Sequence, residues 1–377
     1  MTAKTSKTST GSDRTLSTIL VTGGCGFIGA NFIHYLLGET GRAEHGFAGR
    51  VINLDALTYA GNPANLAEIA ESAGDRYRFV HGDITDTALL KKLFAEEPID
   101  TIVHLAAESH VDRSIHGPQA FVETNVMGTF ALLEAARAAW IGASGEVRDG
   151  VLFHHVSTDE VFGSLGEEGY FLENTSYDPR SPYSASKASS DHLVRAYFHT
   201  YGLPITLTNC SNNYGPYQFP EKLIPVMILN ILDGKPLPVY GDGKNIRDWL
   251  YVEDHNRAVW AVMQRGETGE SYNIGGDNEW ENITLVETLC DIVAEEIGGD
   301  PGKTRELITF VKDRPGHDRR YAIDCTRLKN ELGWKQTVDF AEGLRRTVRW
   351  YLDNPAWIEG VRSGAYREWV ETNYGGR

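Results

Sequence analysis

A regular alternation of short apolar runs with longer helical patterns occupies the first half of the chain. The apolar runs are rich in β-branched and aromatic residues, and they lie at residues 18–22, 50–55, 77–81, 101–105 and 151–156. Runs this apolar are expected to be buried on both faces of a sheet. The helical patterns between them include residues 27–37, 88–94 and 121–140. The alternation predicts an α/β fold, in which a doubly wound parallel sheet carries helices on both faces.

The pattern changes after about Cys210. Turn-rich pieces such as 212–216 and 240–244 alternate with helical patterns at 222–232, 285–297 and 340–353. A chain of 377 residues is long enough for two domains of about 150 residues each. We therefore expect a disordered tail at 1–16, the parallel sheet at 17–209, and a smaller mixed α/β lobe at 210–377. Some chain of the lobe is expected to cross back to the first domain.

Composition and charge exclude several classes of protein. No uninterrupted apolar run approaches the roughly 18 residues of a membrane-spanning helix, and the first fifteen residues lack the apolar core of a secretion signal. The net charge of −16 disfavours a nucleic-acid-binding protein. The cysteines at 25, 210, 290 and 325 are far apart, which predicts reduced thiols and neither disulfides nor a metal site. We expect a cytoplasmic protein with no membrane or nucleic-acid partner.

A glycine-rich loop follows the first predicted strand directly and precedes the first predicted helix. It reads Thr22-Gly23-Gly24-Cys25-Gly26-Phe27-Ile28-Gly29. Glycines allow the tight turn and let backbone N–H groups approach a pyrophosphate, which the helix N-terminus also favours. Asp55 ends the next strand, where a carboxylate binds the ribose hydroxyls of NAD and repels the 2′-phosphate of NADP. The sequence therefore predicts an NAD-binding Rossmann domain at 17–209.

This motif also has a plainer interpretation, as an ordinary turn followed by a surface aspartate. Asp55 follows Gly29 by more than the usual gap, and we attribute the excess to a loop insertion at 38–49. The position of the loop between a strand and a helix favours the dinucleotide. The ends of the third and fourth strands supply further candidate cofactor contacts, for which core packing is the alternative: Asp83, Ile84, Leu105, Ala106 and Ala107.

Tyr183 and Lys187 form a candidate catalytic pair. Pro182 precedes Tyr183 at a position typical of a first helical turn, and residues four apart lie on one face of a helix. A nearby ammonium favours the phenolate and would lower the tyrosine pKa, so that the side chain could take a proton from a sugar hydroxyl. Tyr-x-x-x-Lys also occurs by chance on many helices. The hydroxyl of Ser157, at the end of a preceding strand, favours the catalytic interpretation.

Two adjacent acids directly follow the fifth predicted strand, in the string Ser157-Thr158-Asp159-Glu160. One interpretation is a helix N-cap with acids in its first turn, which is purely structural. The other is a general acid and a general base. Because the Tyr183–Lys187 pair and the NAD loop converge on the same sheet edge, we favour catalysis.

At this point the sequence resembles a known family, the extended short-chain dehydrogenases/reductases, and within it the dehydratases of nucleotide hexoses. The resemblance runs from Leu20 to about Tyr351, and nine strings carry it: TGGCGFIG, LDALTYAGN, HLAAESHVDRSI, ETNVMGT, STDEVFG, YSASKASSDHLVRAY, NCSNNYGPYQFPEKLIP, VYGDGKNIRDWLYVEDH and DRPGHDRRYAID. The chain departs from the family at Phe162, where Tyr is usual, with an expected effect on local packing. The polar N-terminal extension and the 38–49 stretch also differ.

The resemblance implies a reaction on dTDP-glucose that begins and ends with hydride transfer. Tyr183 would remove the proton of the 4-hydroxyl as hydride leaves carbon 4 for NAD, and Thr158 would bind the 4-oxygen. Glu160 would take the carbon-5 proton while Asp159 protonates the departing 6-hydroxyl. Return of hydride to carbon 6 would give dTDP-4-dehydro-6-deoxy-glucose, a precursor of deoxysugars such as dTDP-rhamnose. Lys187 would also hold the nicotinamide ribose.

The resemblance also implies the wider site and the assembly. The expected cofactor contacts are Gly23, Gly26, Phe27, Ile28, Gly29, Asp55, Ala56, Leu57, Thr58, Asp83, Ile84, Leu105, Ala106, Ala107, Ser109, Thr124, Tyr183, Lys187 and Asn213. The expected substrate contacts are Ser109, Thr158, Asp159, Glu160, Asn212, Lys222, Leu223, Pro238, Val239, Tyr240, Arg247, Asn282, Asp313, Arg314, Pro315, Gly316 and His317. Lys222 and Arg247 would face the diphosphate, although a surface ion pair is their plain alternative. The 121–140 helix and the Tyr183 helix would pair with their copies in a homodimer.

Two other functions stay open. The first is another nucleotide-sugar enzyme of the same superfamily, such as a UDP-glucose 4,6-dehydratase, a 4-epimerase or a decarboxylase. Epimerases and decarboxylases generally lack an acid at the place of Asp159. The second is a non-catalytic dinucleotide sensor, which would tend to lose the Tyr183–Lys187 pair.

Overall fold

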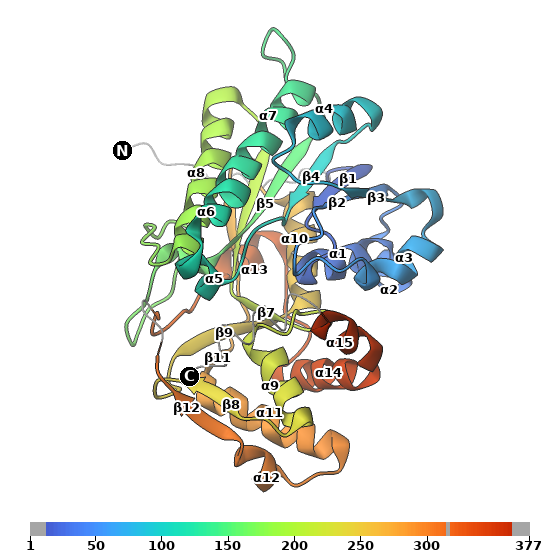
Figure 1. The fold of residues 1–377 in the computed structure, drawn as a ribbon. Coiled ribbons are helices and arrows are strands. Elements are labelled where there is room, and N and C mark those ends of the chain that lie inside the picture. The colour runs from blue at the N-terminus through green and yellow to red at the C-terminus, as the bar shows by residue number, and fades with distance from the viewer. Residues whose placement is uncertain (1–12, 314–316, 364–377) are drawn as a thin grey trace.

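A computed structural model describes residues 13–313 and 317–363 of the chain (Figure 1). Within these residues, the largest element is a seven-stranded parallel sheet with the strand order β10-β6-β5-β4-β1-β2-β3. Its strands are β1 (Thr18–Thr22), β2 (Arg50–Asp55), β3 (Tyr77–His81), β4 (Thr101–His104), β5 (Leu152–Thr158), β6 (Ile205–Cys210) and β10 (Ser271–Ile274). The predicted doubly wound parallel sheet is confirmed, and its first three strands have the predicted bounds.

Helices cover both faces of this sheet. Ile33, Val259 and Leu328 pack in the apolar core on one face, which is covered by α1 (Phe27–Leu37), α10 (Val252–Arg265) and α13 (Thr326–Leu332). Leu90, Leu132 and Val194 pack on the other face, under α4 (Thr87–Glu96), α7 (Thr129–Trp140) and α8 (Pro182–Tyr201). Helices on both faces bury the central strands β1, β4, β5 and β6 completely, as the sequence indicated.

The stretch at 38–49, expected to be a loop, is mostly helical. It forms α2 (Glu39–His45), which is bounded by Gly38 and by Gly46 with a φ of 67°. Glu39, Arg42 and Ala43 are good helix formers, and a glycine in the left-handed conformation is a common helix end. The His45 ring packs against Trp260 of α10 at 4.9 Å between ring centroids. This distant contact was invisible in the sequence.

The helix predicted at 121–140 is present, but it changes its geometry along its length. It consists of α6 (Pro118–Phe121), a π-helical segment η3 (Val122–Gly128) and α7. Asn125 of η3 is buried and donates hydrogen bonds to the Glu108 carbonyl at 3.0 Å and to the Ser186 hydroxyl at 2.8 Å. The π-helical turn thus ties the loop after β4 to helix α8, and π-turns of this kind are frequent at functional sites.

The remaining elements form a second lobe below the sheet in Figure 1. Its strands are β7 (Asn212–Tyr214), β8 (Leu237–Tyr240), β9 (Ile246–Tyr251), β11 (Glu279–Glu281) and β12 (Ile308–Val311), in small sheets of order β11-β9-β7 and β12-β8. Its helices are α9 (Leu223–Asp233), α11 (Asn282–Ile297), α12 (Pro301–Arg305), α14 (Phe340–Asp353) and α15 (Pro355–Arg362). A separate apolar core lies between α9, α11 and α14.

Three elements beyond residue 210 belong to the large sheet and not to the lobe. Strand β10 pairs with β6 at the sheet edge, and α10 and α13 pack on its face. The short elements α3 (Ala67–Ser72), α5 (Val111–His116), η1 (Pro63–Leu66), η2 (Gly74–Arg76) and η4 (Asp159–Phe162) complete the fold. None of the described helices is both long and apolar enough to cross a membrane.

Candidate active site

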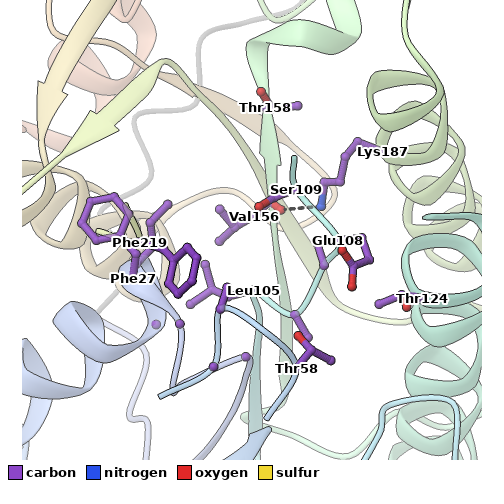
Figure 2. Close-up of a pocket in the computed structure, with 18 of the residues that line it drawn as sticks. Phe27, Thr58, Leu105, Glu108, Ser109, Thr124, Val156, Thr158, Lys187 and Phe219 are labelled. Carbon is purple, nitrogen blue, oxygen red and sulfur yellow. Dashed lines mark hydrogen bonds between the residues drawn. The ribbon is translucent and has the colours of Figure 1, made fainter. Parts of the chain in front are cut away.

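A pocket lies at the carboxyl ends of the central strands, where the large sheet meets the second lobe (Figure 2). Its wall includes Gly23 after β1, Asp55 of β2, Leu105 after β4 and Thr158 of β5. In open parallel α/β sheets this edge is the usual place for a ligand. The fold therefore gathers the candidate residues, which are far apart in the sequence, around one cavity.

The glycine-rich loop is packed too tightly for side chains. Gly23 has a φ of 72°, and a Cβ atom on Gly29 would lie 2.3 Å from the Gly23 carbonyl oxygen. The loop opens directly into α1, whose N-cap residue Gly26 makes no side-chain cap hydrogen bond. The backbone N–H groups at the start of α1 therefore border the pocket without a side-chain partner. A phosphate group fits such a cradle, because the helix N-terminus presents donors and partial positive charge.

Asp55 both borders the pocket and shapes the loop. Its carboxylate accepts hydrogen bonds from the backbone N–H of Cys25 and of Leu57, each at 2.8 Å. Burial raises the pKa of Asp55, and these two hydrogen bonds oppose that rise. Since the acid also borders the cavity, it can accept a further hydrogen bond from a ligand hydroxyl.

The pocket wall contains all but one of the residues predicted to contact the cofactor. The exception is Leu57, which has a φ of 52° and packs its side chain against the apolar core. The residues that do line the pocket are Gly23, Gly26, Phe27, Ile28, Gly29, Asp55, Ala56, Thr58, Asp83, Ile84, Leu105, Ala106, Ala107, Ser109, Thr124, Tyr183, Lys187 and Asn213. The contact predicted for Leu57 stays a prediction.

Tyr183 and Lys187 reach the pocket from the first turns of α8. A capping box between Ser181 and Ser184 begins this helix, with Pro182 in its first turn. The Lys187 Nζ atom donates a hydrogen bond to the Val156 carbonyl oxygen at 2.9 Å (Figure 2). The helix start thus fixes both side chains against the end of β5.

The pKa of Tyr183 differs from the sequence prediction. Burial raises this pKa well above its usual value, the Glu160 carboxylate raises it further, and a hydrogen bond with Thr158 lowers it. The Lys187 ammonium donates to the Val156 carbonyl oxygen; burial lowers the pKa of Lys187 and Asp191 raises it again.

Asp159 and Glu160 lie in different environments although they are adjacent. Asp159 is 1% exposed, and burial, Glu160 and Asp248 raise its pKa well above the usual value, whereas Arg247 opposes the rise. Glu160 is partly exposed and borders the same pocket. A carboxyl with a raised pKa beside a more exposed carboxylate is the arrangement that an acid and a base require.

The structure confirms the N-cap interpretation of this string. Thr158 is the N-cap of the short helix η4, and its hydroxyl accepts the Glu160 N–H at 3.3 Å. Asp159 and Glu160 occupy the first turn. The cap therefore orients both acids, so the structural and the chemical interpretations describe the same turn.

Few of the predicted substrate contacts outside the catalytic group line this pocket. Ser109, Asn212 and Lys222 do, and Lys222 Nζ donates to the Ser109 carbonyl oxygen at 2.9 Å. The residues that do not line it are Leu223 on α9, Pro238, Val239 and Tyr240 on β8, Arg247 on β9, Asn282 on α11, Asp313 and His317. Arg314, Pro315 and Gly316 lie outside the described residues.

Arg247 is buried, which rules out the alternative of a solvated surface ion pair. Its guanidinium donates to the carbonyl oxygens of Ile246 at 2.7 Å and Asp318 at 2.9 Å, and it lies 4.2 Å from the ring centroid of Tyr321. The charge of Arg247 still acts on Asp159. His317, another predicted substrate contact, has its Nδ1 atom 2.6 Å from a carboxylate oxygen of Asp313.

Sequence reasoning missed several pocket residues, of which Glu221 is the most distinctive. This carboxyl accepts a hydrogen bond from the Tyr59 hydroxyl at 3.0 Å, and burial raises its pKa to about 7. The guanidinium of Arg113 lies 3.6 Å from the centroid of the Tyr59 ring. The string that holds Lys222 also contains Glu221, so an acid next to a predicted phosphate-binding lysine was the available signal. The other missed residues are Leu54, Ala60, Gly61, Gly82, Glu108, Val156, Cys210, Ser211, Gln218 and Phe219.

Comparison with known proteins establishes the family. Residues 20–347 match the family model described as GDP-mannose 4,6 dehydratase. The dTDP-glucose 4,6-dehydratase of Shigella flexneri is 54% identical to this chain over 368 residues, which cover 95% of this chain and 99% of that protein. The chain belongs to the dTDP-glucose 4,6-dehydratase family.

Solved structures agree with this family. DesIV of Streptomyces venezuelae, a dTDP-glucose 4,6-dehydratase solved with NAD and TYD bound, superposes with a TM-score of 0.81 at 48% identity, over 91% of this chain and 99% of that one. The UDP-glucose 4-epimerase of Thermotoga maritima has a TM-score of 0.76 but only 27% identity, over 90% of this chain and 99% of that one. The fold is shared with epimerases, whereas the sequence is closer to dehydratases.

The departure from the family at Phe162 affects an apolar cluster. Phe162 is buried, stacks on Phe171 at 5.2 Å between centroids and meets the Tyr177 ring edge-on at 5.3 Å. A phenyl ring packs against these two rings and has no hydroxyl that would need a hydrogen-bond partner. The departure at Phe162 therefore affects local packing.

Proposed function

We propose that the protein is an NAD-dependent dTDP-glucose 4,6-dehydratase, a hydro-lyase. The observation that carries this proposal is the meeting of Tyr183, Asp159 and Glu160 in one pocket beside the glycine-rich loop. The high identity to named dTDP-glucose 4,6-dehydratases over nearly the whole chain supports the same reaction. The product would be dTDP-4-dehydro-6-deoxy-glucose, a precursor for deoxysugars such as dTDP-rhamnose.

NAD is the cofactor that fits the pocket. The tight glycine cradle would hold its pyrophosphate, Asp55 its adenosine ribose and Lys187 its nicotinamide ribose. A carboxylate at Asp55 disfavours the extra phosphate of NADP. When bound, NAD accepts hydride from carbon 4 of the sugar and returns it to carbon 6.

Tyr183 would act as the base in the oxidation of carbon 4. Its phenolate takes the proton of the 4-hydroxyl, and the Thr158 hydroxyl, which hydrogen-bonds Tyr183, would bind the same sugar oxygen. The positive charges of Lys187 and of the nicotinamide ring favour the phenolate. Ionisation of a tyrosine at such a buried position needs these charges.

Asp159 and Glu160 would carry out the elimination of water. Once carbon 4 is a ketone, the proton on carbon 5 is acidic, and Glu160 takes it. Asp159, kept protonated by burial and by its acidic neighbours, gives its proton to the 6-hydroxyl, which leaves as water. Hydride return to carbon 6 with reprotonation of carbon 5 by Glu160 completes a redox-neutral cycle.

We propose that the remaining predicted contacts bind the nucleotide part of the substrate. Lys222 and Asn212 reach the pocket, and Arg247 lies behind Asp159. A lysine and an arginine would supply the positive charge that a diphosphate requires in a chain whose net charge is −16. The expected contacts on β8, on α11 and around Asp313 stay predictions.

We further propose that the protein is a homodimer formed through the face of α7 and α8. Val122 and Met127 are each 51% exposed, and Phe130 is 40% exposed, on successive turns of η3 and α7. Exposed apolar residues on one face are typical of a buried contact with another copy. Met127→Asp should produce monomers in sedimentation velocity, whereas the control Phe79→Asp on the distant edge strand β3 should leave dimers.

The cytoplasm is the proposed location. All of the cysteines are buried and unpaired in the structure, which agrees with a reducing compartment. Peptide-tagged protein should fractionate with cytoplasmic markers.

The test of the reaction compares nucleotides. Purified protein should convert dTDP-glucose to a 4-keto sugar without added reductant, and convert UDP-glucose many times more slowly. A preference for UDP-glucose would indicate the other dehydratase, and formation of dTDP-galactose alone would indicate an epimerase. If the protein binds NAD but converts neither sugar, the remaining hypothesis is the non-catalytic dinucleotide sensor.

A further inference from the structure

A buried carboxylate lies directly behind the Tyr183–Lys187 pair. Asp191 follows Lys187 by one turn on α8 and is 0% exposed. Its oxygens accept hydrogen bonds from the Ser157 hydroxyl at 2.8 Å, the Tyr177 hydroxyl at 2.8 Å and the His155 Nε2 atom at 3.1 Å. A carboxylate only accepts, so His155 must carry its proton on Nε2. Three donors from β5 and from the loop before α8 thus converge on Asp191.

The groups around Asp191 are mostly neutral. Burial lowers the pKa of His155 to about 4 and that of His104 well below its usual value, so neither imidazole is charged near neutrality. Burial raises the pKa of the Cys210 thiol to about 12, and it also raises that of the Tyr177 phenol. Charged groups also act on this region: Lys187 acts on His155 and on Cys210, Asp159 acts on Cys210, and Arg195 acts on Tyr177.

Lys187 needs an opposite charge where it lies. It is 5% exposed, and its Nζ atom donates a hydrogen bond to the neutral carbonyl of Val156, next to Ser157. Burial lowers the pKa of Lys187, and Asp191 is the largest influence that raises it again. A buried ammonium without an anion tends to lose its proton. Lys187 hydrogen-bonds Val156 of β5, and Asp191 hydrogen-bonds the next residue of that strand, Ser157.

We propose that Asp191 is the counter-ion of Lys187: a positioning residue that keeps the ammonium charged at the end of β5. This proposal rests on the function proposed above for Tyr183 and Lys187. Asp191 touches neither substrate nor cofactor, and it acts through Lys187. Loss of its charge should make Lys187 give up its proton at a lower pH, and Tyr183 would then lose a charge that favours its phenolate.

The experiment isolates the oxidation of carbon 4. A dTDP-pentose that lacks carbon 6 cannot lose water, so the NAD-loaded enzyme can only move the 4-hydroxyl proton to Tyr183 and hydride to NAD. Absorbance at 340 nm reports this step in a single turnover. Asp191→Asn keeps the shape of the side chain, and the alkaline limb of its rate profile should move to lower pH by about one unit or more. Tyr177→Phe, which removes one donor but keeps the charge, should leave that limb in place.

Thermal stability tests the same pairing if Asp191→Asn folds too poorly for the kinetic experiment. Lys187→Met leaves Asp191 buried without its partner, so adding Asp191→Asn to Lys187→Met should raise the Tm of that variant. Asp191→Asn alone should lower the Tm of the wild type. If the two changes lower the Tm additively, the two residues are not paired and the proposal is overturned.

The outcomes separate this proposal from the proposed function. A rate that Asp191→Asn reduces equally at every pH would show a purely structural role and would overturn the proposal, while the wild type would still oxidise the pentose. Absence of any signal at 340 nm in the wild type, with dTDP-glucose also unconverted, would instead reject the function.

Discussion

Replacement of Asp159 by Asn removes the acidic proton of the side chain and keeps its size and shape. Asp159 is almost fully buried, and its Oδ1 atom accepts a hydrogen bond from Thr158 at 3.3 Å. Asn has the same shape and can keep that contact. Its amide cannot donate a proton to a leaving hydroxyl in the way that a carboxylic acid can. The variant should therefore fold, bind NAD and bind the substrate.

The size of the effect follows from the chemistry of the step. General acid catalysis contributes about 10²- to 10⁴-fold, which corresponds to roughly 3–5 kcal/mol in activation free energy. Burial, Glu160 and Asp248 raise the pKa of Asp159, so the wild type keeps this contribution to a higher pH than an ordinary aspartate would and loses it as the pH rises through the raised pKa. We expect the rate of water loss from dTDP-glucose to fall by this factor.

Two measurements show which step of the reaction Asp159→Asn slows. Formation of the 4-keto-6-deoxy sugar should slow, but oxidation at carbon 4 does not use Asp159, so absorbance at 340 nm should accumulate toward one reduced cofactor per site. Glu160→Gln is the matched control: it should slow product formation similarly and also abolish exchange of the carbon-5 proton with solvent. Wild-type turnover by Asp159→Asn, or failure of the 340 nm absorbance to rise, would refute the assignment of this residue as the acid.

Three further results are expected. Deuterium placed at sugar carbon 4 should reappear at carbon 6 of the same molecule, and its appearance in solvent would contradict internal hydride return. Gly29→Ala should reduce the NAD content of purified protein severalfold, measured from the ratio of absorbance at 260 and 280 nm, because its Cβ would lie 2.3 Å from the Gly23 carbonyl oxygen. Gly166→Ala, with nothing within 4 Å of its added Cβ, is the control and should retain NAD. Asp248→Asn should move the alkaline limb of the dehydration rate to lower pH, since a negative charge that raises the pKa of Asp159 is removed; an unchanged limb would count against this coupling.

Local signals predicted the parts of the site that local chemistry determines. The first strand, the loop at Gly23–Gly29 and the start of α8 at Pro182 have the predicted places because each is encoded in a short stretch of turn, cap and apolar residues. The motifs also placed Asp159 and Glu160 at the end of β5. These features needed no knowledge of distant contacts.

Distant contacts explain what the sequence did not show. Helix α2 packs through His45 on Trp260, and Glu221 reaches Tyr59 across the pocket. The pKa of Tyr183 depends on burial and on Glu160, which spacing along α8 cannot reveal. These features depend on contacts between residues that are far apart in the sequence. Helical periodicity and turn chemistry predict only the local backbone conformation around each residue.

The placement of β10 at the edge of the large sheet has a consequence for biosynthesis. Its partner β6 ends at Cys210, but Ser271–Ile274 must leave the ribosome before that edge can be covered. A nascent chain therefore holds an open, apolar parallel edge while some sixty further residues are translated, which is several seconds at about 5–20 residues per second. Truncation before residue 271 should yield aggregates, and chaperones that shield exposed strands should raise the yield of the whole chain.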